Sequence, residues 1–385
     1  YELGKYIPRD IKKAIHYYSL ASELKHPIAQ LELGNIYISG KYISTDIEKA
    51  IKYFTLAADQ NCIEAQYNLG VLYSQKLNDH FNIELAIYYF ELCSKRNFIQ
   101  AKLNLAYIYY EGKKAPKDIK KAIYYLQSPA EQNNAQALNL LGVIYKENIE
   151  FDFNKSLKYF QLAANQKDAD ALCNLGVIYC NGEYVARDLP RAIHYFKLAA
   201  EQNHSNSLYC LGKIFMSQDI NKAIHYLKLS SDQNNLNASN LLGAIYLTKE
   251  FSHFDIQKGI HYIELAASQN LDIALYNIGL LYEKGNILPK NILKAFEYYS
   301  RAANLNFAYA QYKIGFYYYT RKEINKSIYF LTMASKSMRA VCFELGFIYH
   351  YGIHIQQDIW KAISYYKEAS SIDVQYAKNN LAMIY

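Results

Sequence analysis

A chain of 385 residues could hold two or three ordinary domains, and its formal net charge of +7 is too mild to indicate a nucleic-acid-binding protein by itself. Its longest apolar runs are short, as at 140–145, which excludes a membrane-spanning segment within this sequence. The chain is rich in tyrosine, asparagine, lysine and isoleucine together. All four have A/T-rich codons, so aromatic abundance alone is not evidence for a binding site.

An aromatic residue recurs along the chain at steps of 31 to 36 residues. A period in this range is typical of a stacked repeat array, in which each repeat buries its apolar face only against its neighbours. We therefore expect one continuous array of eleven repeats over 1–385, used as an elongated binding surface. The recurring positions are Tyr1, Tyr37, Tyr73, Tyr109, Tyr145, Tyr179, Phe215, Tyr246, Tyr282, Tyr318, Tyr349 and Tyr385.

The second repeat, 29–61, shows the elements that each repeat is expected to form. Apolar and small residues recur over 29–37 at the spacing of one helix face, and they do so again over 50–58. No alternating stretch is long enough to predict a strand. The sequence therefore predicts an all-α fold in which each repeat is a pair of helices of roughly 12 and 14 residues.

Polar residues mark both ends of each second helix. An Asp or Asn before a helix accepts hydrogen bonds from the free N–H groups of its first turn, and an Asn after it tolerates the left-handed conformation. A proline within a helix removes a hydrogen bond, so we expect a kink or an early end at Pro129. The expected starts are Asp10, Asp46, Asn82, Asp118, Asp152, Asp188, Asp219, Asp255, Asn291, Glu323 and Asp358, and the expected ends are Asn61, Asn97, Asn133, Asn203, Asn234, Asn270 and Asn306.

A small residue recurs in the middle of each first helix. A mid-helix glycine costs about 1 kcal/mol, so its recurrence indicates a close helix contact. We expect the partner to be the alanine near the start of the second helix, such as Ala192 for Gly176, and we expect Gly176→Leu to destabilise the fold by about 1–3 kcal/mol through overpacking. The small residues are Gly34, Gly70, Ala106, Gly142, Gly176, Gly212, Gly243, Gly279, Gly315, Gly346 and Ala382.

The pattern A-x-x-x-L-G-x-I-Y, followed by G-x-Y-x-x-x-D and K-A-I-x-Y-F-x-L-A-A-x-Q-N, resembles the Sel-one-like repeat, a relative of the tetratricopeptide repeat. The segments 65–70, 171–179 and 188–203 match it closely. The turn between the helices is longer than in the tetratricopeptide form, and the proline that usually ends that form is absent. The resemblance implies a right-handed α-α superhelix, a solenoid that serves as an adaptor in macromolecular complexes.

The two ends and the cysteines bear on the setting of the chain. It begins without methionine and both ends fall on the same repeat position, so we expect a window cut from a longer protein. The spacing of the six cysteines does not recur from repeat to repeat, which favours free thiols in a reducing compartment. We therefore expect a cytoplasmic location, with an extracytoplasmic one as the alternative.

Two rows of polar residues recur in the second helices. The row of His16, His194, His225 and His261 has one member per repeat, which favours plain surface over a metal site. The basic row would suit a polyanion, but solvent-facing lysines beside acidic residues are the stronger interpretation. It comprises Lys13, Lys49, Lys121, Lys155, Arg191, Lys222, Lys258, Lys294, Lys326 and Lys361. The motifs G-x-S-x-G, H-E-x-x-H and the P-loop are missing, so we expect no catalytic residue, no metal and no cofactor.

The sharpest hypothesis concerns the concave groove, which the first helices line in related helix-pair repeats. Its positions lie three residues before the mid-helix glycine, one after it and four after it. Aromatic side chains there would anchor a peptide segment; alternatively, a tightly wound superhelix buries them between neighbouring repeats. The predicted partner-binding residues, densest over 312–347, are Tyr67, Tyr107, Tyr110, Tyr209, Tyr276, Tyr312, Phe316, Tyr319, Phe343 and Phe347.

These observations favour a non-enzymatic scaffold that binds a partner protein or peptide in the groove. A helical-repeat RNA-binding protein of the pentatricopeptide type is the alternative, because its period is similar. That type lacks the mid-helix L-G and the paired alanines found here, so we expect no nucleic-acid partner. A hydrolase ranks third because its motifs are missing.

Overall fold

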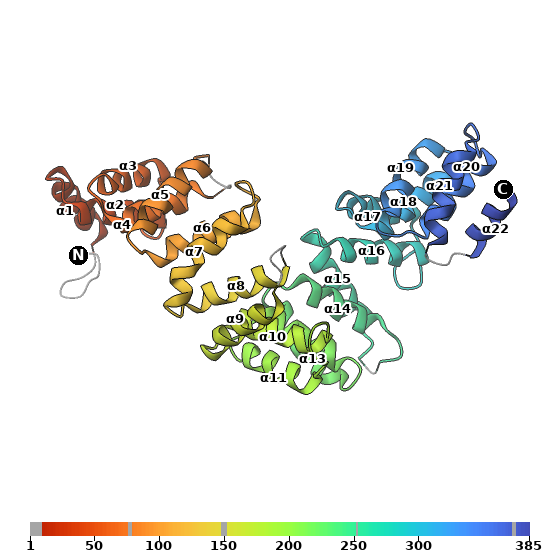
Figure 1. Ribbon diagram of the computed structural model, residues 1–385, viewed down its shortest axis with the longest axis horizontal. Coiled ribbons are helices and arrows are strands. Elements are labelled where there is room, and N and C mark those ends of the chain that lie inside the picture. The colour runs from red at the N-terminus through yellow and green to blue at the C-terminus, as the bar shows by residue number, and fades with distance from the viewer. Residues whose placement is uncertain (1–9, 76–78, 148–151, 252, 372–374) are drawn as a thin grey trace. The chain divides into compact units, whose positions relative to one another are not determined.

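The computed structural model describes residues 10–75, 79–147, 152–251, 253–371 and 375–385. These residues form α-helices with no strand among them, which confirms the predicted all-α fold (Figure 1). None of the helices so described combines the length and the apolar character needed to cross a membrane. The helices are α1 (Ile11–Glu23), α2 (Pro27–Ser39), α3 (Ile47–Ala58), α4 (Ile63–Tyr73), α5 (Ile83–Lys95), α6 (Ile99–Glu111), α7 (Ile119–Glu131), α8 (Ala135–Glu147), α9 (Phe153–Asn165), α10 (Ala169–Asn181), α11 (Leu189–Ala200), α12 (Ser205–Phe215), α13 (Ile220–Ser231), α14 (Leu236–Leu247), α15 (Ile256–Ser268), α16 (Asp272–Lys284), α17 (Ile292–Asn304), α18 (Ala308–Thr320), α19 (Ile324–Ser335), α20 (Val341–Tyr351), α21 (Ile359–Ser370) and α22 (Gln375–Ile384).

The helices pair as the repeat predicts. Each even-numbered helix from α2 to α20 is the first helix of a repeat, and the odd-numbered helix after it is the second. The chain divides into two compact units, Tyr1–Ala199 and Ala200–Tyr385. Helices α1 to α10 pack each against the next in the first unit, and α12 to α22 do so in the second. A single continuous array over 1–385 stays a prediction, and the first aromatic position, Tyr1, lies outside the described residues.

The recurring tyrosine closes each repeat through a set of contacts that we call the tyrosine clasp. In the repeat of α2 and α3, the rings of Tyr37 and Tyr53 stack with centroids 5.8 Å apart, and Lys49 Nζ lies 5.2 Å from the Tyr37 centroid. The backbone N–H of Asp46 donates to the carbonyl of Tyr37 at 3.0 Å, and the Asp46 carboxylate pairs with Lys49 at 3.0 Å. One aromatic residue per repeat thus joins the end of the first helix to the start of the second.

The same ring pair recurs in both compact units, which gives the sequence period a structural cause. An aromatic pair of this kind contributes about 0.5–1.5 kcal/mol beyond the area that it buries. The pairs are Tyr37–Tyr53, Tyr73–Tyr89, Tyr109–Tyr125, Tyr145–Tyr159, Tyr179–Tyr195, Phe215–Tyr226, Tyr246–Tyr262, Tyr282–Tyr298, Tyr318–Phe330 and Tyr349–Tyr365.

The mid-helix glycines do mark close contacts, but the side chain nearest to each is four residues after the expected alanine. The backbone at the alanine position also lies close, as the carbonyl of Ala223 does to Gly212. A Cβ added to Gly176 would lie 2.5 Å from the ring of Phe196, one helical turn after the expected Ala192. The buried ring therefore lies directly over the glycine. The same contact is made by Phe54, Phe90, Phe160, Tyr299 and Tyr366, and by the aliphatic side chains of Leu227, Ile263 and Leu331.

The predicted ends of the second helices are largely confirmed. All seven predicted asparagines adopt a positive φ, between 58° and 65°. The Asp and Asn side chains at the predicted starts accept a hydrogen bond from the backbone N–H three residues later, as in Lys49 N to Asp46 Oδ1 at 2.9 Å. Glu323 is the exception: it makes no side-chain cap. Its carboxylate instead binds Lys326 Nζ at 2.7 Å.

Pro129 does not end its helix early, so that part of the prediction is wrong. Helix α7 continues through Pro129 to Glu131. The proline lies in the last turn, is buried, and its carbonyl accepts the backbone N–H of Asn134 at 2.9 Å. Near the end of a helix a missing N–H removes only one hydrogen bond of the ladder, and the packing of the ring offsets that loss.

Candidate functional site

Five of the ten predicted groove residues come together in one group, and the other five lie apart from it. None of the ten is fully buried, and Tyr107, Phe316 and Phe347 are exposed. Those that do not join the group are Tyr67, Tyr107, Tyr110, Tyr209 and Tyr276. Tyr67, for example, packs against the rings of Phe90 and Phe98. The predicted role of all ten in partner binding stays a prediction.

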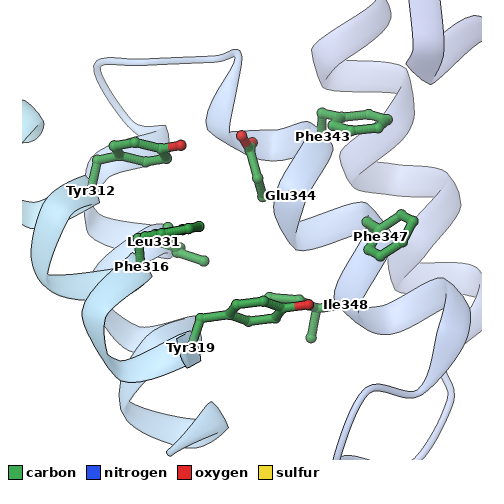
Figure 2. A pocket seen from close by; sticks show the side chains of 8 residues that line it. All are labelled: Tyr312, Phe316, Tyr319, Leu331, Phe343, Glu344, Phe347 and Ile348. Carbon is green, nitrogen blue, oxygen red and sulfur yellow. The ribbon is translucent and has the colours of Figure 1, made fainter. Parts of the chain in front are cut away.

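Five of the predicted residues line one pocket of about 200 Å³ in the C-terminal compact unit (Figure 2). Three of them, Tyr312, Phe316 and Tyr319, are spaced i, i+4 and i+7 along α18, so they share one helix face. Phe343 and Phe347 share a face of α20 in the same way, and Figure 2 shows Glu344 and Ile348 between them and the α18 side chains. The remaining lining residues are Leu331, Glu344 and Ile348.

The rings of this pocket are partly core and partly free. Tyr312 and Tyr319 pack against the buried cluster formed with α19 and α20, and Phe343 packs against the cluster formed with α21 and α22. Phe316 and Phe347 belong to neither cluster and are 53% and 37% exposed. Two large apolar side chains at the mouth of the pocket thus remain open to a partner.

Sequence reasoning missed three lining residues, and one of them, Glu344, carries an ionisable group. Its carboxyl lies between the rings of Tyr312 and Phe343 in Figure 2. The atom Oε2 is buried, and it has no hydrogen-bond partner within the part of the chain that the structure describes. Burial raises the pKa of this carboxyl above its ordinary value.

The neighbouring carboxylate shows how such a group is ordinarily satisfied. Glu283, on α16, accepts a hydrogen bond from Tyr299 Oη at 2.7 Å and pairs with Lys313 Nζ at 2.8 Å. Burial acts to raise the pKa of Glu283, but the bonds from Lys313 and Tyr299 bring it below its ordinary value. Glu283 lines a second pocket of about 130 Å³, which shares Phe316 with the first, and there its carboxylate is already paired with Lys313.

The basic and histidine rows have local roles in the helices. Seven lysines of the basic row pair with the carboxylate three residues before them, as Lys222 does with Asp219 at 3.0 Å. The four histidines are exposed and each lies beside the ring of the next tyrosine. No group of three or more His, Cys, Asp or Glu side chains suited to hold a metal occurs among the described residues.

Two buried cysteines serve the packing. Cys93 and Cys342 are fully buried, and burial raises the pKa of each thiol to about 11. Both thiols therefore stay protonated near neutral pH and pack as small apolar groups. The cytoplasmic location stays a prediction.

Paired helices that lock a ring over a mid-helix glycine, repeat after repeat, place the protein in the class of helix-pair α-solenoids. The model of the Sel1 repeat matches eleven successive segments of the chain: 1–26, 27–62, 63–97, 99–134, 135–168, 169–204, 207–235, 240–271, 272–307, 308–337 and 340–373. The chain therefore belongs to the Sel1 repeat family, as the sequence resemblance implied.

Solved structures agree with this assignment at the level of the fold. The crystal structure of c5321, a protective antigen of uropathogenic Escherichia coli with an SLR fold, has 23% sequence identity and a TM-score of 0.56, covering 96% of this chain and 82% of that one. A Sel1 repeat protein from Oxalobacter formigenes has 21% identity and a TM-score of 0.56, covering 78% and 88%. None of the curated proteins compared with the chain matches it.

Proposed function

We propose that this chain is a non-enzymatic interaction scaffold, and that it binds a partner protein or peptide on the face of its first helices. The observation that carries the proposal is the aromatic pocket between α18 and α20, where five rings converge and two stay open. Large aromatic side chains in a concave site are the residue type most often found at the centre of binding interfaces.

The open rings of Phe316 and Phe347 lie outside the two buried clusters to which the other rings of the pocket contribute. In the two repeats that line the pocket, the helices are joined by the side chain over the glycine, Leu331 or Tyr366, and by the tyrosine clasp. Because Phe316 and Phe347 are exposed, the free protein lacks the stabilisation that burying their apolar surface would give. That stabilisation is about 25 cal/mol per Å² of buried area. A partner that covers these rings recovers that stabilisation.

The size and chemistry of the pocket favour binding over catalysis. Its volume of about 200 Å³ lies below the about 300–1,000 Å³ of a small-molecule site, so it suits one side chain of a larger partner. Its described lining holds one carboxyl and two tyrosine hydroxyls among apolar groups, without a nucleophile beside a base.

The test uses two variants as baits in lysate of the source cell, and each variant loses four aromatic side chains. The groove variant changes Tyr312, Phe316, Phe343 and Phe347 to Ser. The matched control changes four exposed aromatic residues of second helices to Ser, namely Tyr88, Tyr124, Tyr329 and Trp360. Circular dichroism and thermal unfolding establish that both variants are folded.

We expect the parent chain and the matched control to retain the same protein and the groove variant to lose it, because each anchor ring contributes about 2 kcal/mol or more. Equal recovery by all three baits would contradict the proposal and place specificity on another surface. Recovery of RNA in place of protein, lost at high salt, would favour the RNA-binding alternative.

A further inference from the structure

Glu344 occupies a position that other repeats give to asparagine. The position lies two residues before the mid-helix glycine of the first helix. The first helices of successive repeats stack, so a side chain at this position can bond to the first helix of the preceding repeat. The asparagines that share it are Asn68, Asn104, Asn174, Asn277 and Asn380.

In four repeats the asparagine bonds to the first helix of the preceding repeat. Asn104 Nδ2 donates to Tyr67 Oη at 3.3 Å. Two further bonds run from Asn174 Nδ2 to Asn139 Oδ1 at 3.0 Å and from Asn277 Nδ2 to Asn240 Oδ1 at 2.9 Å. These three acceptors lie three residues before the glycine of their own helix, so their bonds form one recurring inter-repeat link. The fourth bond runs from Asn68 Nδ2 to Asn35 Oδ1 at 3.2 Å, one residue after the glycine.

Glu344 interrupts this link. The residue in the acceptor position of the preceding helix is Tyr312, the counterpart of Tyr67, but an ionised carboxylate has no N–H to donate to it. Neither a hydrogen bond to Oε2 nor an ion pair to this carboxyl is formed within the described chain. Lys313 follows Tyr312 in the sequence, and its ammonium group is already paired with Glu283.

We propose, resting on the function proposed above, that this pocket takes the cationic side chain of a partner peptide, an arginine or a lysine. The faces of aromatic rings attract a cation within about 6 Å of the centroid, most strongly where water is excluded. Rings of Tyr312, Phe316 and Phe347 line the pocket, and Glu344 Oε2 is a buried acceptor within it that has no partner in the described chain. A cationic side chain is the occupant that satisfies both the rings and the carboxylate.

The burial of the carboxyl fits this role. A buried acceptor without a partner is unfavourable in the free protein, and a bound ammonium or guanidinium group removes that penalty through a charge-assisted hydrogen bond. The aliphatic stem of either side chain would pack against Leu331 and Ile348 at the base of the pocket. The pocket therefore selects a long side chain that ends in a positive charge.

The experiment selects binders from a displayed library of random peptides on the whole chain, and it then measures affinities by fluorescence anisotropy. The best peptide is made in a neutral form, with citrulline in place of arginine or norleucine in place of lysine. Both peptides are titrated against the parent chain, against Glu344→Gln and against Phe316→Ser. Glu32→Gln is the matched control, since Glu32 holds the same helix position outside the aromatic pocket and already accepts Asn35 Nδ2 at 3.3 Å.

We expect selected peptides to share a basic residue, and Glu344→Gln to weaken the basic peptide by about tenfold or more, as for close charge pairs at other interfaces. The neutral peptide should bind the parent and Glu344→Gln chains equally, and Glu32→Gln should change neither affinity. Peptides that need Phe316 but not a positive charge or Glu344 would overturn this inference and leave the proposed function standing. Failure to select any peptide that depends on Phe316 would contradict both.

Discussion

At one buried position near the start of each second helix, the presence of a single hydroxyl group affects the stability of the fold. This position is an alanine in most repeats, such as Ala50 and Ala192, and it is fully buried there. Two repeats carry serine instead. Ser156 Oγ donates to the carbonyl of Gly142 at 2.7 Å, whereas Ser327 Oγ is buried without a partner in the described structure.

These two serines predict opposite effects of the same substitution. Ser327→Ala removes an unsatisfied buried hydroxyl and should stabilise the protein by about 1 kcal/mol, whereas Ser156→Ala removes a made hydrogen bond and should destabilise it by about 1 kcal/mol. The measurement is the midpoint of urea unfolding for each variant against the parent chain. Shifts of the same sign for both variants would contradict this reading of the two hydroxyls.

Residues whose role depends on nearby sequence were predictable, and those whose role depends on a neighbouring helix were not. Asn61 and Asp46 end and begin helices through their own backbone and first turn, so the sequence alone identified them. Glu344 resembles any surface glutamate in sequence. The signal that could have found it was its place in a column of asparagines, and its meaning required the pocket that α18 and α20 line together.

At the scale of the helix pair, the recurring tyrosine and the recurring glycine mark two contacts between the same two helices. The clasp joins the helices where they are connected, and the ring over the glycine joins them at mid-length. The helical periodicity of the sequence predicted both helices of the pair. It did not predict that Phe196 rather than Ala192 meets Gly176, because the two lie one turn apart on the same face and only the helix crossing decides between them.

The ring over the glycine predicts that even one methyl group is too large at Gly176. A Cβ there would lie 2.5 Å from the ring of Phe196, which is only 1% exposed and has little room to move. Gly176→Ala should therefore destabilise the protein by about 1–3 kcal/mol, and Gly176→Leu by at least as much.

The coupling of the two residues provides the control. Phe196→Leu frees space, so the double variant Gly176→Ala with Phe196→Leu should be more stable than the sum of the two single effects predicts. Thermal or urea unfolding of the four proteins gives this coupling. Strictly additive effects would show that the ring does not meet the added methyl group.

At the scale of the whole molecule, the sequence was sufficient for the fold class and for the family. Eleven repeated patterns agree at many spaced positions, and the family match covers the same repeats. The groove positions counted from the glycine also named five of the eight residues that line the pocket. The other three come from positions outside that count: Leu331 lies on the second helix α19, and Glu344 and Ile348 lie on α20 directly after Phe343 and Phe347.

The central claim is that a partner contacts the open face of α18 and α20 rather than the second helices. The most direct measurement is site-specific photo-crosslinking in the source cell. One variant carries p-benzoylphenylalanine in place of Phe316, and the control carries it in place of Trp360 on α21. Both positions are exposed, at 53% and 83%. We predict a covalent protein adduct from position 316 and not from position 360; an adduct from 360 with none from 316 would contradict the claim.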